Sequence, residues 1–155
     1  MDDLDARSFG AFLGRSLDEV RADVPLAWAR LRAALGGRDV LFVVDAEPVL
    51  LRADARGLGL LRGAAVAETL AARRPDVAVR TTRAAILRMV DGETTLARAV
   101  LDGAFDLVGR LDDLLAFDGA LRAYLHGAVR SPAQPNLLRA WRADEAAPPP
   151  DHSAR

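Results

Sequence analysis

The sequence predicts an α+β fold in one domain, with helices at both ends and strands between them. The chain has 155 residues, of which 51% are hydrophobic, and this length is sufficient for one domain with a buried core. Apolar residues lie at helical spacing up to Gly36-Gly37, alternate with polar residues in the middle of the chain, and return to helical spacing after Thr82.

Residues 1–36 form a predicted N-terminal helical segment, which we expect to pack on the rest of the domain. Apolar side chains follow one another at helical spacing from Leu17 to Leu35. Ser16 and Glu19 have the spacing of a capping box, which predicts the beginning of the main helix at Ser16. Upstream of it, Phe9, Phe12 and Leu13 predict a short extra helix. Pro25 lies within this pattern and is expected to kink the helix or to divide it.

Five strands are predicted in residues 37–142, which would form the α+β domain itself. They are rich in β-branched residues or alternate apolar with charged residues, and turn-forming residues separate them. The predicted strands are Val40–Val44, Val49–Arg56, Gly57–Gly63, Val77–Thr81 and Phe105–Gly109.

Three helices with one apolar side each are predicted over 83–90, 95–102 and 111–128. Residues 64–74 have a helical composition but lie between strands, so that helix, strand and loop all stay open there. Residues 143–155 include three consecutive prolines and are predicted to form a disordered tail.

The composition argues against several kinds of function. The net charge is −1, so no long-range field would attract nucleic acid or an anionic membrane. The chain has no cysteine, and its two histidines, His126 and His152, are far apart, so no metal site and no cofactor are expected. The acidic N-terminus is unlike a signal peptide and no apolar run approaches about 20 residues, which predicts a cytoplasmic location without a transmembrane segment.

A recognisable order of elements begins near Asp76. A strand is followed by a helix ending in Asp-Gly, a short helix ending in Gly, a strand with the pattern aromatic-x-Leu-x-Gly, and a long helix. The stretches concerned are Pro75–Thr81, Ile86–Gly92, Ala99–Gly103 and Phe105–Gly109. This order resembles the lipid-binding domains of the sterol carrier protein (type two) family, over roughly Asp39 to Gly127, although the strands before Asp76 are only loosely similar.

The resemblance implies a curved, mostly antiparallel sheet that is covered on one side by helices, as in a bacterial stand-alone member of the family. It also implies an apolar tunnel for a fatty acyl chain, a sterol or an isoprenoid-like molecule, without a metal and without catalysis. The predicted tunnel lining consists of Leu41, Val43, Val49, Leu51, Val79, Ile86, Met89, Val90, Val100, Phe105, Leu107, Leu114, Phe117 and Leu121. The apolar pattern by itself favours a solid core, and only the resemblance favours a cavity.

Two arginines are candidate anchors for a carboxylate head group at the tunnel mouth. Arg52 and Arg80 lie on predicted strands, and a guanidinium binds a carboxylate through two parallel hydrogen bonds. A solvent-exposed sheet face is the alternative interpretation of both residues.

Two further functions stay open. A cavity protein in a biosynthetic pathway can act as an accessory or cyclase-like enzyme on a hydrophobic substrate, with a few polar groups assisting. The candidate groups are Asp45, Glu47, Asp54 and His126. Alternatively, the N-terminal helices could bind a partner enzyme or a second copy of the chain, forming a homodimer. The apolar residues that would serve this are Phe9, Phe12, Trp28 and Leu31.

Overall fold

A five-stranded sheet with the strand order β3-β2-β1-β4-β5 forms the centre of the computed structural model, which describes residues 7–54 and 56–143. The strands are β1 (Asp39–Val44), β2 (Glu47–Asp54), β3 (Gly57–Arg62), β4 (Val77–Thr81) and β5 (Asp106–Gly109). Neighbouring strands pair antiparallel, except that β1 and β4 are parallel. The predicted α+β class and the mostly antiparallel five-stranded sheet are therefore confirmed.

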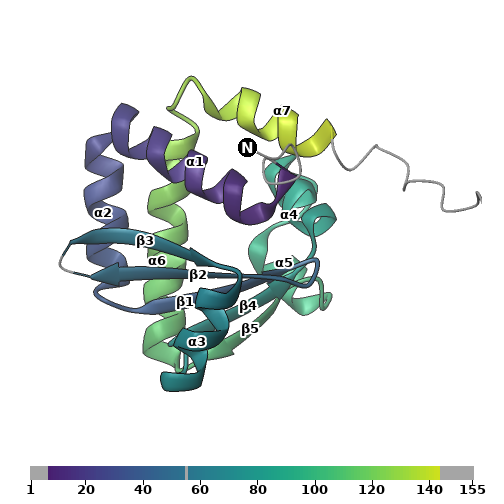
Figure 1. The fold of residues 1–155 in the computed structure, drawn as a ribbon. Coiled ribbons are helices and arrows are strands. Elements are labelled where there is room, and N and C mark those ends of the chain that lie inside the picture. Colours follow the sequence, from purple (N-terminus) through teal and green to yellow (C-terminus); the bar gives the residue numbers. More distant parts are fainter. Residues whose placement is uncertain (1–6, 55, 144–155) are drawn as a thin grey trace, which may run out of the picture.

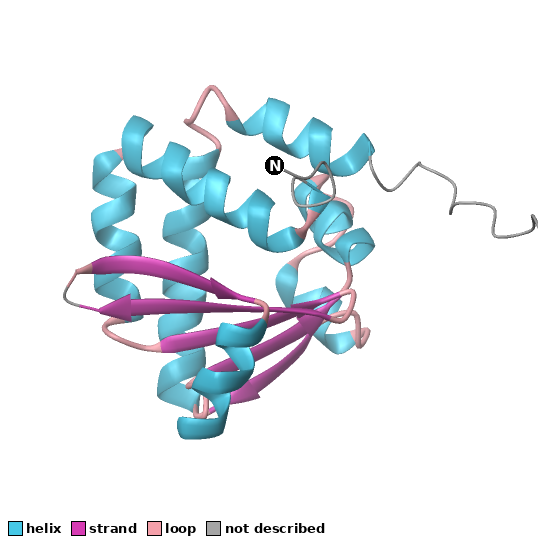
Figure 2. Cartoon of the chain, viewed as in Figure 1, coloured by secondary structure: helices cyan, strands magenta, loops and turns pink. Residues whose placement is uncertain are grey.

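Helices cover mainly one face of this sheet (Figure 1). They are α1 (Phe9–Asp23), α2 (Pro25–Leu35), α3 (Ala64–Ala72), α4 (Arg83–Val90), α5 (Leu96–Leu101), α6 (Leu111–Ala128) and α7 (Gln134–Ala143). Helices α1, α2, α6 and α7 lie over one face, while α4 and α5 close one end of the space beneath them (Figure 1). Figure 2 shows the helices in cyan and the strands in magenta, with α3 in front of the strands and α6 behind them.

Residues 64–74, for which the sequence left helix, strand and loop open, contain helix α3. It packs against β2 and β3 on the second face of the sheet. Val66 of α3 and Leu50 of β2 are both buried, although Leu50 points away from the main helical layer. The second sheet face thus has a small apolar contact of its own.

Helix α1 begins at Phe9, well before the predicted start. The Ser8 hydroxyl accepts the N–H of Ala11 at 3.0 Å, and the Glu47 carboxylate accepts the N–H groups of Phe9 and Gly10 at 2.9 and 3.0 Å. These acceptors satisfy the N–H groups that a helix start leaves without an internal partner. The predicted start at Ser16 is wrong, because the capping carboxylate comes from β2 and Ser16 is buried inside α1.

Pro25 divides the N-terminal helical segment, as one of the two predicted outcomes. Helix α1 ends at Asp23 and α2 begins at Pro25, where a missing N–H has no consequence for the helix. Helix α2 ends at Leu35 and is capped by Gly36, whose φ of 55° is in the left-handed region that favours glycine.

Helix α6 lies close to both α1 and α2 at Gly127. A Cβ atom at Gly127 would lie 2.7 Å from Val20 Cγ1 and 3.0 Å from Ala27 Cβ, and both neighbours are buried. We therefore expect Gly127→Ala to lower the free energy of unfolding by about 1–3 kcal/mol, despite the higher helix propensity of alanine. Gly119→Ala is the matched control, because its new Cβ would meet only Ala34 Cβ at 3.8 Å. Equal denaturation midpoints for the two variants would contradict this account of the packing.

The predicted tail over 143–155 lies, apart from Ala143, outside the described residues. Across the described ranges, no helix combines the length and the apolar character that crossing a bilayer requires.

Candidate ligand-binding cavity

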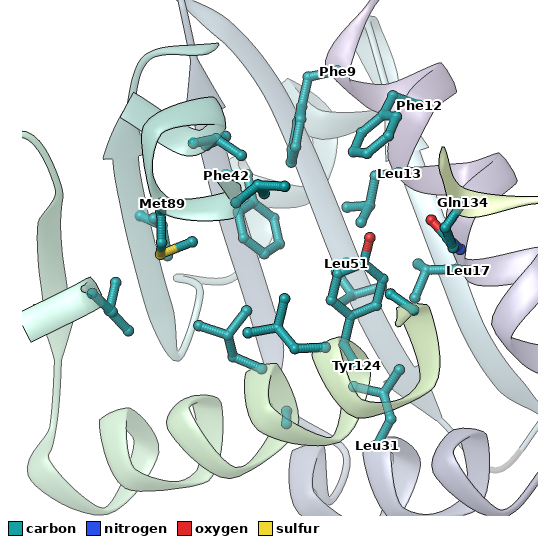
Figure 3. A pocket seen from close by; sticks show the side chains of 18 of the residues that line it. Phe9, Phe12, Leu13, Leu17, Leu31, Phe42, Leu51, Met89, Tyr124 and Gln134 are labelled. Carbon is teal, nitrogen blue, oxygen red and sulfur yellow. The ribbon is translucent and has the colours of Figure 1, made fainter. Parts of the chain in front are cut away.

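A cavity of about 610 Å³ lies between the sheet and the helices that cover it. This volume is within the range of about 300–1,000 Å³ that is usual for small-molecule sites. Figure 3 shows side chains from several elements converging on it. The lining residues are Phe9, Phe12, Leu13, Leu17, Leu31, Leu35, Phe42, Leu51, Val79, Thr81, Ile86, Met89, Val90, Leu96, Phe105, Phe117, Ala120, Leu121, Tyr124, Leu125, Ala128, Val129, Ser131, Gln134, Pro135 and Leu138.

The wall of the cavity is almost entirely apolar. Its polar members are Thr81, Tyr124, Ser131 and Gln134, and none of the described lining residues carries a charge. An apolar molecule is stabilised in such a space by about 25 cal/mol for each Å² that leaves water. The wall therefore suits a hydrophobic ligand and offers no ionic partner to an acidic or basic one.

Alternation along the strands decides which sheet residues reach the cavity. Phe42 of β1 is the register partner of Val79 on β4, and both face the cavity. Phe42 also contacts the rings of Phe9 and Phe117, with centroids 5.6 and 6.1 Å away. Leu41 must consequently point to the other sheet face. Because β1 is apolar at nearly every position, the sequence pattern could not show which set of residues faces inward.

The structure brings only some of the predicted tunnel residues to this wall. Those at the wall are Leu51, Val79, Ile86, Met89, Val90, Phe105, Phe117 and Leu121. Their contact with a ligand stays a prediction.

The other predicted tunnel residues lie elsewhere, namely Leu41, Val43, Val49, Val100, Leu107 and Leu114. Leu41 and Val43 point to the second sheet face because of the strand alternation. Val49 is enclosed in the core, and Leu107 and Leu114 pack against it. Val100 lies on the solvent side of α5. Apolar character alone did not distinguish these positions from the wall.

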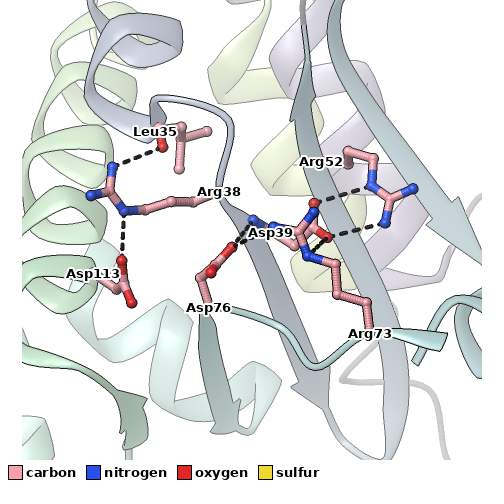
Figure 4. Close-up of polar contacts among 7 residues, drawn as sticks. All are labelled: Leu35, Arg38, Asp39, Arg52, Arg73, Asp76 and Asp113. Atoms are coloured by element: carbon pink, nitrogen blue, oxygen red, sulfur yellow. Dashed lines mark hydrogen bonds and ion pairs between the residues drawn. The ribbon is translucent and has the colours of Figure 1, made fainter. Parts of the chain in front are cut away.

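The two predicted head-group anchors lie on the sheet face opposite the cavity. Arg52 donates two hydrogen bonds to the Asp39 carboxylate, at 3.1 and 3.0 Å (Figure 4). These bonds and the charge of Asp39 raise the pKa of Arg52. Arg80 directly follows the inward-facing Val79 and is exposed. The anchor prediction is corrected accordingly, since strand alternation points both guanidinium groups away from the cavity.

The candidate acid–base groups also lie outside the cavity wall. Asp45, Glu47 and Asp54 accept backbone N–H groups at helix starts and in a turn. His126 is exposed on α6. The carboxylates thus have local structural roles, and these four groups are not assembled around the cavity.

The N-terminal helices supply a part of the wall that the sequence did not assign to it. Helix α1 contributes Phe9, Phe12, Leu13 and Leu17, and α2 contributes Leu31 and Leu35. The only sequence signal was their helical spacing, which a stripe of ordinary core residues shares.

A hydrogen-bonded group joins three helices at the wall. The Ser16 hydroxyl oxygen lies 2.5 Å from Tyr124 Oη and donates to Gln134 Oε1 at 2.7 Å. Gln134 Nε2 donates in turn to the Ser16 carbonyl at 2.9 Å. Burial raises the pKa of Tyr124. The phenol is therefore neutral over the physiological pH range.

Helix α7 is held over the cavity by aromatic and ionic contacts. Trp141 stacks on Phe12 with ring centroids 4.5 Å apart, and the Arg83 guanidinium lies 5.2 Å from the Trp141 ring centroid. Arg142 donates to both carboxylate oxygens of Asp91 at 2.7 and 2.6 Å, and these bonds lower the pKa of Asp91. The end of α7 is thus tied to both α1 and α4.

Three lining residues show where the cavity reaches the surface. Val90 and Leu125 are partly exposed, and the side chain of Val129 is 80% exposed. They lie at the C-terminal ends of α4 and α6.

The sequence matches no protein-family model and no curated protein. Several solved structures are similar to it in fold, among them the two that follow. The structure titled "UbiJ-SCP2 Ubiquinone synthesis protein" has a TM-score of 0.52 and 16% identity, with 73% of this chain and 88% of that chain covered. A sterol carrier protein domain 2 of Helicoverpa armigera has a TM-score of 0.52 and 12% identity, with coverage of 80% and 93%. At these identities the similarity establishes the architecture, and the chain therefore has the fold of the sterol carrier protein 2 domains.

Proposed function

We propose that this protein binds and carries a lipid, a sterol or another hydrophobic small molecule in its apolar cavity, without catalysing a reaction. The observation that carries the proposal is the 610 Å³ space whose described wall has no charged side chain. The shared fold adds support, because the two solved structures are named for sterol carriage and for ubiquinone synthesis. We further propose a cytoplasmic location and association with a partner enzyme or a second copy, as inferred from the sequence.

The geometry gives less support to the two alternative functions. The candidate acid–base groups cap helices and turns or face solvent, and none of them is among the described lining residues. Phe9, Phe12 and Leu31, which could have bound a partner, instead face the cavity and the core. Binding of an apolar ligand needs only the apolar wall, and none of the polar groups that already have structural roles.

Titration with diphenylhexatriene, a fluorescent hydrocarbon, tests the proposal directly. The emission of this probe rises when it leaves water, so we expect saturable enhancement with about one probe for each chain. The protein unfolded in guanidinium chloride is the control, because the cavity exists only in the folded state. Native mass spectrometry of the purified protein should also reveal a bound apolar molecule. A folded protein that neither carries such a molecule nor enhances the probe would contradict the proposal.

A further inference from the structure

The three hydroxyl groups at the cavity wall are candidates for recognising a polar group on the ligand. Thr81 Oγ1 donates to the Ala104 carbonyl at 2.8 Å, and Ser131 Oγ donates to an Asp23 carboxylate oxygen at 2.6 Å. A hydroxyl has one proton to donate and two lone pairs that accept. Thr81 and Ser131 can therefore offer only acceptor capacity to a ligand.

The third hydroxyl, that of Tyr124, can also offer only acceptor capacity, because its neighbours take its proton. The Ser16 carbonyl can only accept, which fixes Gln134 Nε2 toward it and Gln134 Oε1 toward the Ser16 hydroxyl. Ser16 therefore gives its single proton to Gln134. The 2.5 Å contact between Ser16 Oγ and Tyr124 Oη then requires Tyr124 to be the donor. Tyr124 Oη keeps lone pairs for a ligand but no proton.

Tyr124 is also the polar residue best placed to meet a ligand. Its ring projects among the lining side chains, and its oxygen points toward Leu13 of α1 (Figure 3). A donor that reaches Tyr124 Oη would extend a chain of hydrogen bonds through Ser16 to Gln134, and such chains strengthen their members cooperatively. Burial also keeps the phenol from ionising.

We propose that Tyr124 Oη selects, among apolar ligands, neutral molecules that carry a hydroxyl group. This inference rests on the proposed carrier function and specifies its ligand. A ligand hydroxyl would donate to Tyr124, whereas an ether oxygen at the same place would meet only lone pairs. A carboxylate would meet no cation among the described wall residues, and burying an unpaired charge is strongly unfavourable.

Competition against diphenylhexatriene tests this selectivity with molecules of equal chain length. We expect dodecanol to displace the probe about three- to tenfold better than its methyl ether, which is the usual effect of one neutral hydrogen bond. Dodecanoate at neutral pH should compete more weakly than dodecanol. In Tyr124→Phe the alcohol and the ether should compete equally.

Two further variants keep the test specific. Thr81→Val removes another wall hydroxyl and should leave the preference for the alcohol intact. Ser16→Ala releases the proton of Tyr124, so the ratio of alcohol to ether affinity should fall toward one. If wild-type protein binds the probe but treats alcohol and ether alike, or if Thr81→Val alone removes the preference, the Tyr124 inference is overturned. Failure of the wild type to bind the probe would instead overturn the carrier function itself.

Discussion

Replacing Ala120 with tryptophan is expected to lower the affinity for an apolar ligand by at least about tenfold while the protein stays folded. Ala120 lines the cavity from α6 and is only 3% exposed, so a larger side chain there must point into the cavity. Inserting a large residue into a filled core costs about 1–3 kcal/mol through strain. An indole in unoccupied space avoids most of that strain and takes the place of the ligand. Diphenylhexatriene titration and guanidinium unfolding measure the two effects separately.

The matched control is Ala67→Trp, which introduces the same side chain at an exposed position of α3 on the other face of the sheet. This variant should bind the probe like the wild type. If Ala120→Trp retained full affinity, the ligand would have to lie elsewhere. If it failed to fold, the space beside Ala120 would be too small to admit a side chain.

Removing the Trp141 side chain is expected to produce the largest loss of stability, about 3–5 kcal/mol in the free energy of unfolding. Trp141 is 2% exposed and stacks on Phe12, with their planes only 6° apart. In Trp141→Ala the aromatic contacts between α7 and α1 disappear and leave a void. Trp141→Phe should cost considerably less, because it retains most of the apolar contact. It also removes an indole N–H that is buried without a partner among the described residues.

Trp28→Ala is the control, because it makes the same change of residue type at a less buried position. Trp28 is half-buried on α2, where the Arg21 guanidinium lies 5.9 Å from its ring centroid. We expect its removal to cost clearly less than the removal of Trp141. Equal losses in urea or guanidinium unfolding would show that α7 contributes little to the stability of the domain.

The fold was predictable from the sequence wherever local chemistry decides it. Pro25 divided the N-terminal helices, and Thr82 caps α4 through the N–H of Ala85 at 3.1 Å. The capping of α1 was only partly predictable in this way. Ser8 caps it locally through the N–H of Ala11 at 3.0 Å, but the Glu47 carboxylate that accepts the N–H of Phe9 is 38 positions away. The nearby Ser16-Glu19 pair gave a misleading local signal.

The cavity was less predictable than the fold. The helix residues Ile86, Met89 and Phe117 were expected at its wall and lie there. The sheet residues could not be assigned, because a strand that is apolar on both faces gives no alternation to read. The place of Gln134 at the cavity wall was not predicted. A glutamine near a helix start suggests solvent exposure, and only the tertiary structure places it against Ser16.

The cavity wall is drawn from both the first and the last described helices. Ser16 of α1 and Gln134 of α7 meet although 118 positions separate them, and Phe12 and Leu138 line the same space. Such an enclosure is complete only when the whole domain has assembled, and a bound molecule would stabilise the association of α1 with α7. Stability measured in the presence of ligand should then rise with ligand concentration, by about 2.7 kcal/mol at a hundred times the dissociation constant. The melting temperature of freshly purified protein would then depend on how much ligand is still bound to it.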